Sequence, residues 1–200
     1  RWGVVGAVAL AAAAAAWDPD GMRRVVRLRA EVRRMEAENA KLASENAAPL
    51  LCGGATVFSP LRRWVKPSMR VGVVGIGGLG HLALQFASAM GCEVTAISST
   101  PDKEAEARGF GAHHFLATRE PKALRSAALS LDFILSTVFV TPDWDALLGA
   151  LRPNGVLCLV GATSEPLSVP AFTLLGQQKS VTGSAIGGRP AIREMLAFAA

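Results

Sequence analysis

The spacing of hydrophobic and polar positions divides the chain into three regions. Residues 2–17 are uncharged and almost entirely small or apolar, and residues 22–46 repeat apolar positions at alternating spacings of three and four. Residues 49–200 alternate short apolar runs with helical patterns. These patterns predict an apolar segment, an amphipathic helix and an α/β domain, in that order.

The apolar segment is short for a membrane span. At about 1.5 Å per helical residue it falls below the roughly 30 Å of a hydrocarbon core, and its alanines give a weak membrane signal. Trp2 and Trp17 flank it, as aromatic side chains at a membrane interface do. A secretory hydrophobic region, a truncated membrane span and a buried helix therefore all stay open for residues 1–17.

The second region has the pattern of a heptad seam. Its a positions are Val25, Val32, Asn39 and Asn46, and its d positions are Leu28, Met35 and Leu42. Asparagine at an a position favours an in-register dimer, because two such side chains can bond each other across the seam. The pattern predicts a coiled-coil-like helix over 22–46, either as a homodimer contact or as a single helix packed on the rest of the protein.

The third region predicts a doubly wound, Rossmann-like α/β fold with a parallel sheet. Strands are expected near 70–74, 93–98, 114–117, 131–137 and 156–162. Helices are expected near 81–91, from residue 101 onward, and near 121–129 and 143–151. Such alternation of strands with helices is typical of parallel sheets covered on both faces.

A glycine fingerprint lies between the first strand and the first helix of this region. Gly75, Gly77 and Gly80 have the spacing of a dinucleotide-binding turn, with Gly78 and Leu79 inside it. We expect Gly75 to permit the tight turn, Gly77 the approach of a pyrophosphate, and Gly80 the close contact of helix with strand. The amides at the helix N-terminus would face the phosphates.

The end of the second strand indicates which dinucleotide is preferred. Ser98, Ser99 and Thr100 stand where an acidic residue would pair with the ribose of NAD, and Lys103 follows them. Three hydroxyls and a cation favour NADP(H), although Asp102 is an opposing charge. The alternative is an ordinary polar turn that caps the next helix.

Charge and cysteine content exclude some classes of function. The formal charge is +5 and the basic residues interleave with acids, so the sequence does not indicate nucleic-acid binding. Cys52, Cys92 and Cys158 are an odd number without a short spacing, which fits neither a disulfide framework nor a four-thiolate zinc ribbon. We therefore expect a reducing compartment.

Several separated motifs resemble the cinnamyl-alcohol-dehydrogenase branch of the zinc-containing medium-chain alcohol dehydrogenases. They are APLLCGG, GIGGLGHLALQFA, AISSTPDKEAEA, LVGATSEPLSVP and VTGSAIGGRPAIREMLAFAA. The resemblance implies hydride transfer between NADPH and an aldehyde–alcohol pair, with zinc polarising the carbonyl oxygen. It implies Cys52 as a zinc ligand, and cofactor contacts from Thr56, Thr137, Val138, Gly161, Ser184, Ala185 and Ile186.

The chain departs from this family in two places. A catalytic zinc needs three protein ligands, yet the family's other ligands belong to an N-terminal domain for which residues 1–46 offer no cysteine or histidine. We expect the chain to be catalytically incomplete, either a truncated gene product or two joined sequences. Ser68 replaces a usual turn glycine before the first strand, so strain is expected there.

Residues 1–46 resemble a second family, the septum-formation initiators. The resemblance rests on the apolar segment, the basic heptad helix and the pairs Glu38-Asn39 and Glu45-Asn46. It implies a membrane-tethered coiled-coil interaction protein as the alternative function. That family places its coiled coil outside the cytoplasm, whereas an NADPH-binding domain is expected inside it, so a membrane anchor conflicts with a cytoplasmic Rossmann domain.

Overall fold

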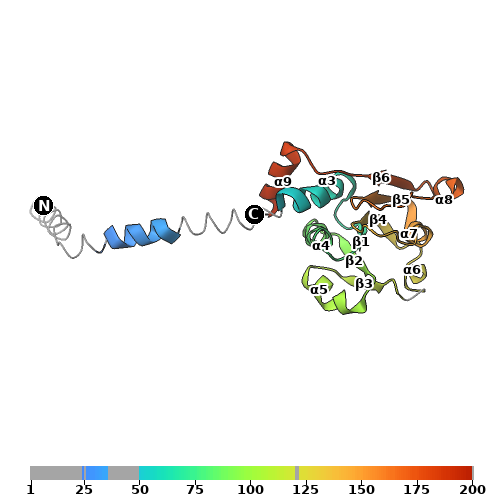
Figure 1. Ribbon diagram of the computed structural model, residues 1–200, viewed down its shortest axis with the longest axis horizontal. Helices are drawn as coiled ribbons and strands as arrows, with labels where there is room; N and C mark the ends of the chain where they lie inside the picture. Colours follow the sequence, from blue (N-terminus) through green and yellow to red (C-terminus); the bar gives the residue numbers. More distant parts are fainter. Residues whose placement is uncertain (1–23, 25, 36–49, 120–121, 200) are drawn as a thin grey trace, which may run out of the picture. The chain divides into compact units, whose positions relative to one another are not determined.

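The computed structural model describes residues 24, 26–35, 50–119 and 122–199 (Figure 1). The chain divides into two units at residue 48, and each unit is described by itself. Within the described ranges, the helices lack the combination of length and apolar character that crossing a bilayer requires. The apolar segment predicted for residues 1–17 lies outside these ranges.

The first unit holds a helix at residues 24 and 26–35. The exposed fractions of Leu28, Val32 and Met35 on this helix are 53%, 47% and 52%. Three predicted seam positions are thus apolar and open to solvent within their unit. The other seam positions, Val25, Asn39, Leu42 and Asn46, lie outside the described residues.

The second unit is an α/β domain. Its helical elements are η1 (Leu50–Gly54), α3 (Ala55–Trp64), α4 (Gly80–Ala89), η2 (Pro101–Lys103), α5 (Glu104–Gly109), α6 (Ala123–Ser126), α7 (Trp144–Ala150), α8 (Ala171–Leu175) and α9 (Arg189–Ala199). Its strands are β1 (Arg70–Val74), β2 (Glu93–Ser98), β3 (His114–Ala117), β4 (Leu131–Ser136), β5 (Leu151–Leu159) and β6 (Ser180–Gly183).

The strands form one parallel sheet in the order β3-β2-β1-β4-β5-β6. Val71 of β1 pairs with Val94 of β2 on one side and with Phe133 of β4 on the other. After β3 the chain returns to the centre and continues in the opposite direction from β4. The predicted Rossmann-like fold is confirmed, and the reversal opens a crevice at the carboxyl ends of β1 and β4.

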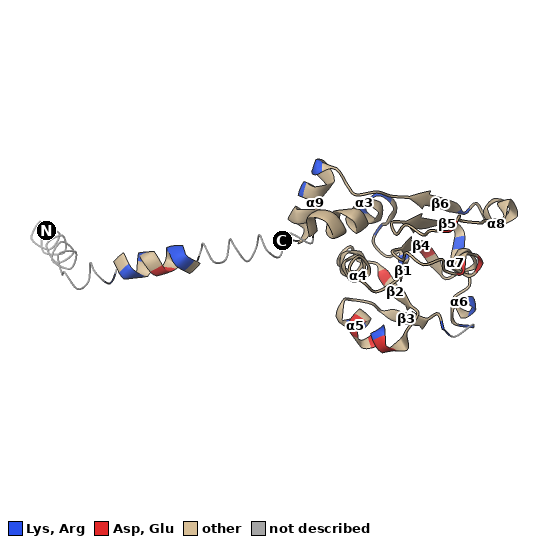
Figure 2. Ribbon diagram, viewed as in Figure 1, with Lys and Arg blue, Asp and Glu red and all other residues tan. Residues whose placement is uncertain are grey.

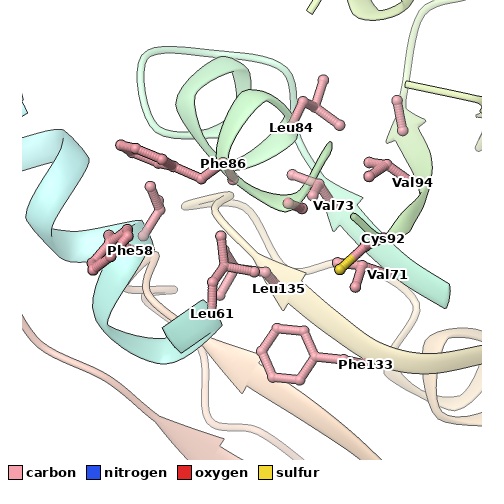
Figure 3. Packing of buried hydrophobic residues seen from close by; sticks show 14 of the residues in the cluster. Phe58, Leu61, Val71, Val73, Leu84, Phe86, Cys92, Val94, Phe133 and Leu135 are labelled. Atoms are coloured by element: carbon pink, nitrogen blue, oxygen red, sulfur yellow. The ribbon is translucent and has the colours of Figure 1, made fainter. Parts of the chain in front are cut away.

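Helices cover both faces of the sheet, which explains why its strands are continuous apolar runs. On one face α3, α4 and α9 pack over Val71, Val73 and Phe133. Figure 3 shows the part of this layer that α3 and α4 form. The rings of Phe58 in α3 and Phe86 in α4 meet edge to face, with 5.4 Å between their centroids. On the other face α6 and α7 pack against side chains such as Ile97, Ile134 and Leu157.

Two predicted elements differ from the structure by three residues or more at one end. The helix expected over 121–129 is short: α6 ends at Ser126, because the amides of Leu129 and Ser130 instead bond the carbonyls of Gly149 and Ala150. The fifth strand runs over Leu151–Leu159 instead of 156–162, and its pairing with β4 is irregular between Leu131 and Phe133.

The loop before β1 is strained where the sequence predicts it. Ser68 has φ = 69°, in the left-handed region that glycine tolerates and serine does not favour. Its amide donates to the carbonyl of Gly91, which fixes the loop against the end of α4.

Candidate functional site

A cavity of about 500 Å³ lies at the carboxyl ends of β1, β2 and β4. This is the place where open α/β sheets bind ligands. Seven of the predicted cofactor residues line it: Gly75, Gly77, Ser98, Ser99, Thr100, Lys103 and Val138.

The glycine turn is shaped by very close backbone approaches. Gly75 has φ = 90°, and a Cβ at Gly80 would lie 1.8 Å from the carbonyl oxygen of Gly75. In contrast, a Cβ at Gly77 or at Gly78 would meet no atom within 4 Å. Gly75 and Gly80 are therefore required by the fold, whereas Gly77 and Gly78 leave open space at the N-terminus of α4.

Residues after β4 and β5 hold this turn in place. The hydroxyl of Thr137 donates to the carbonyls of Val74 at 2.8 Å and of Gly75 at 3.2 Å. A Cβ at Gly161 would lie 2.1 Å from the carbonyl oxygen of Val138. Thr137 thus bonds the turn directly, Gly161 permits a close approach to Val138, and neither residue lines the cavity.

The tip of β2 presents hydroxyls and one cation to the cavity. Ser98 is buried, and its hydroxyl accepts a hydrogen bond from the amide of Thr100 at 3.3 Å. Lys103 lines the cavity and forms an ion pair with Glu106, with 2.6 Å between Nζ and Oε2. Asp102 is exposed and is not among the lining residues, so the opposing charge lies off the cavity wall.

The remaining walls of the cavity come from residues that the sequence analysis did not identify. They are Val74, Ile76, Ile97, Thr118, Leu124, Val140, Thr141, Pro142, Asp143, Ala146 and Leu147. Thr118 directly follows β3, and Thr141 to Asp143 precede α7, so most of them could have been found by collecting the strand ends that share one edge of the sheet. Asp143 also caps α7 by accepting from the amide of Ala146 at 3.0 Å.

Cys52 and Thr56 lie on η1 and α3, beside the start of α4. The hydroxyl of Thr56 donates to the carbonyl of Cys52 at 2.8 Å, and Cys52 is exposed. A Cβ at the adjacent Gly53 would be 3.5 Å from Leu79 and 3.9 Å from the carbonyl oxygen of Gly78. Cys52 therefore belongs to a segment that borders the glycine turn.

The segment after β6 supplies the last predicted contacts. The amide of Ser184 donates to the carbonyl of Leu159 at 2.9 Å, and Ala185 and Ile186 follow it at the carboxyl edge of the sheet. Ile186 is 56% exposed. None of these three residues, nor Thr56, is among the residues that line the cavity at β2.

The residues present do not fit a catalytic zinc ion. In the described part of the chain, no three side chains of histidine, cysteine, aspartate or glutamate come together as a metal site. Cys92 and Cys158 are buried, and burial raises the pKa of both thiols, which disfavours the thiolate that binds metal. Cys52 is left as a single candidate ligand where three are needed.

Comparison with known proteins agrees with the fold. A family model described as zinc-binding dehydrogenase matches residues 78–200. An aldehyde reductase of Synechocystis is 47% identical over 155 residues, and the NADP-dependent alcohol dehydrogenase C 1 of Mycolicibacterium smegmatis is 45% identical over 160 residues. The matches cover 77% and 80% of this chain but 46% of each relative, so the chain spans less than half their length.

Solved structures of related enzymes superpose on the same part of the chain. The cinnamyl alcohol dehydrogenase SbCAD4 of Sorghum bicolor has a TM-score of 0.74 and 44% identity. CAD from Helicobacter pylori, complexed with NADP(H), has a TM-score of 0.68 and 35% identity. Each match covers 76% of this chain and 44% of the solved one.

Proposed function

This chain belongs to the zinc-binding dehydrogenase family, and we propose that its residues 49–200 are the NADP(H)-binding domain of a cinnamyl-alcohol-dehydrogenase-like enzyme. The observation that carries the proposal is the cavity at the carboxyl ends of β1, β2 and β4, which joins the open glycine turn to Ser98–Thr100 and Lys103. Relatives named as NADP-dependent or solved with NADP(H) support the choice of cofactor.

The residues of the cavity have separate roles in this proposal. Gly77 and Gly78 leave room for the pyrophosphate at the start of α4. The free amides of the first turn of this ten-residue helix, and the positive end of its dipole, face the pyrophosphate. Ser99, Thr100 and Lys103 receive the 2′-phosphate. The apolar part of the cavity wall receives the adenine.

We assign the transfer of hydride between NADPH and an aldehyde or alcohol to the complete enzyme. A zinc ion would supply Lewis-acid chemistry at the substrate oxygen in that enzyme, and among the described residues Cys52 is the one candidate ligand for it. Thr56, Ser184, Ala185 and Ile186 would position the nicotinamide at the other end of the sheet edge. A cytoplasmic location follows from the same proposal, because NADPH is a reductant of that compartment.

We also propose that the N-terminal helix associates with a second copy through Leu28, Val32 and Met35, which are about half exposed within their unit. The alternative of a membrane-tethered division protein gains no support from the family match or from these relatives, which are dehydrogenases and a reductase.

Two glycines that are both open to solvent provide the test of cofactor binding. Gly77→Ala places a methyl group where the pyrophosphate would approach, so we expect NADPH affinity to fall about tenfold or more, a cost of roughly 1.4 kcal/mol. Gly109→Ala on α5, where a Cβ also meets no atom within 4 Å, serves as the control and should leave binding unchanged. Titration calorimetry on both variants of the full chain measures this. Equal affinities in the two variants would argue against the turn as the phosphate site.

A further inference from the structure

Lys103, the lysine that lines the cavity, already has a partner. Its ammonium is 2.6 Å from a carboxylate oxygen of Glu106 in the first turn of α5, and the two side chains are 44% and 45% exposed. Glu106 itself does not line the cavity. Any phosphate that reaches Lys103 must therefore share this ammonium with a carboxylate held three residues along the chain.

We propose that Glu106 sets the strength of coenzyme selection by competing with the 2′-phosphate of NADPH for Lys103. This inference rests on the proposed function, because it assumes that NADP(H) occupies the cavity. Glu106 is a positioning residue here, since it acts through Lys103 and does not contact the ligand.

Glu106 has two opposing effects on phosphate binding. The carboxylate orders the Lys103 side chain, which helps binding, and it pairs with the ammonium that the phosphate would otherwise bind alone, which hinders binding. An exposed ion pair at this spacing orders a lysine only weakly. Sharing the ammonium weakens its bond with a phosphate bearing up to two negative charges, so it is the larger effect, and Glu106 lowers the preference for NADPH over NADH.

The same short helix contains a matched control. Glu104 forms an ion pair with Arg108 at 2.8 Å, and these side chains are 48% and 51% exposed. Figure 2 shows acidic and basic residues adjoining on α5. Arg108 does not line the cofactor cavity. Replacing Glu104 therefore removes one negative charge from α5 without releasing Lys103.

The experiment measures NADPH and NADH affinities of the full chain by calorimetry. We expect Glu106→Gln to bind NADPH about two- to fivefold more tightly than the wild type, the size of effect typical of an exposed ion pair. NADH affinity should not change, and Glu104→Gln should behave as the wild type with both cofactors. In a Lys103→Met background, Glu106→Gln should produce less than half of this gain.

The binding results separate this inference from the proposed function. If the wild type binds NADPH and Glu106→Gln binds it equally or more weakly, the proposed competition by Glu106 is wrong. The assignment of the cavity to NADP(H) is not affected by that result. An equal gain from Glu104→Gln, or a full gain without Lys103, would also overturn it, because the effect would then be general electrostatics. A wild type that binds neither cofactor would instead overturn the proposed function.

Discussion

The fold constrains two of the three fingerprint glycines of the dinucleotide turn, each in a different way. At Gly80 a side chain would collide with the backbone of Gly75, and at Gly75 the backbone itself has a positive φ. Gly77 has neither constraint, so the fold alone does not require it. In our proposal the space beside Gly77 holds the pyrophosphate, as the sequence spacing predicts.

Ser68 gives a test of local strain. Ser68→Gly removes the cost of a left-handed serine, which stabilises the fold by about 1–2 kcal/mol. Glycine also loses more conformational entropy on folding, so we expect a net stabilisation of about 0.5–1 kcal/mol. Asn154→Gly is the control, because Asn154 also has a positive φ of 65° but asparagine tolerates that region. Urea unfolding of both variants measures the change. No gain at Ser68 would show that the loop is not strained.

Cys158 predicts a pH dependence of stability. Burial raises the pKa of this thiol from 9.0 to about 11, against the weaker opposing effect of the Arg63 charge. Because the folded-state pKa is the higher one, the stability from the neutral thiol is complete below pH 9 and is lost as the pH rises from 9 toward 11. The loss approaches about 3 kcal/mol at most.

The measurement for Cys158 is the difference in stability between the wild type and Cys158→Ala, followed by thermal unfolding across this alkaline range. This subtraction removes the contributions of Cys92, whose pKa is also raised, and of Lys179, whose pKa is lowered by burial and which acts in the opposite direction. We expect the wild type to lose stability faster with rising pH than the variant does. Parallel curves would contradict the burial of the thiol.

At the scale of elements, prediction from sequence succeeds where local pattern and burial agree. The strands at 93–98 and 114–117 have the bounds predicted for them, and the apolar run of the first follows from burial on both faces of the sheet. The short α6 could not be predicted, because the amides after it bond carbonyls near the end of α7. Strand β6 likewise has no local signal of its own, since it is defined by pairing with β5. Contacts between elements that are distant in sequence thus decide the boundaries that local pattern misses.

The N-terminal helix gives a prediction at the same scale. If Leu28, Val32 and Met35 form a dimer seam, a peptide of residues 20–46 should show helicity that rises with concentration, because pairing buries these side chains. Val32→Lys should abolish the rise. Val26→Lys is the matched control, since Val26 is also exposed but lies off the seam. Circular dichroism measures both, and helicity independent of concentration would leave only a single amphipathic helix.

At the scale of the whole molecule, the sequence predicts the cofactor half of the site and leaves the rest open. The glycine turn and the tip of β2 are each continuous in sequence, so their residues could be identified before the fold was known. The other cavity residues, such as Thr118, Leu124 and Thr141, come from separate parts of the chain, so finding them requires the order of the strands as well as the local pattern. The zinc site is incomplete in the sequence and also among the described residues, where Cys52 is the single candidate ligand.

The choice between NADPH and NADH decides whether the cavity is assigned correctly. Titration calorimetry of the full chain with each cofactor should show tighter binding of NADPH, by about tenfold, because Ser99, Thr100 and Lys103 can bond the 2′-phosphate and a charge-assisted contact contributes roughly 1.5–3 kcal/mol. Equal affinities, or a preference for NADH, would contradict the assignment of this cavity to NADP(H).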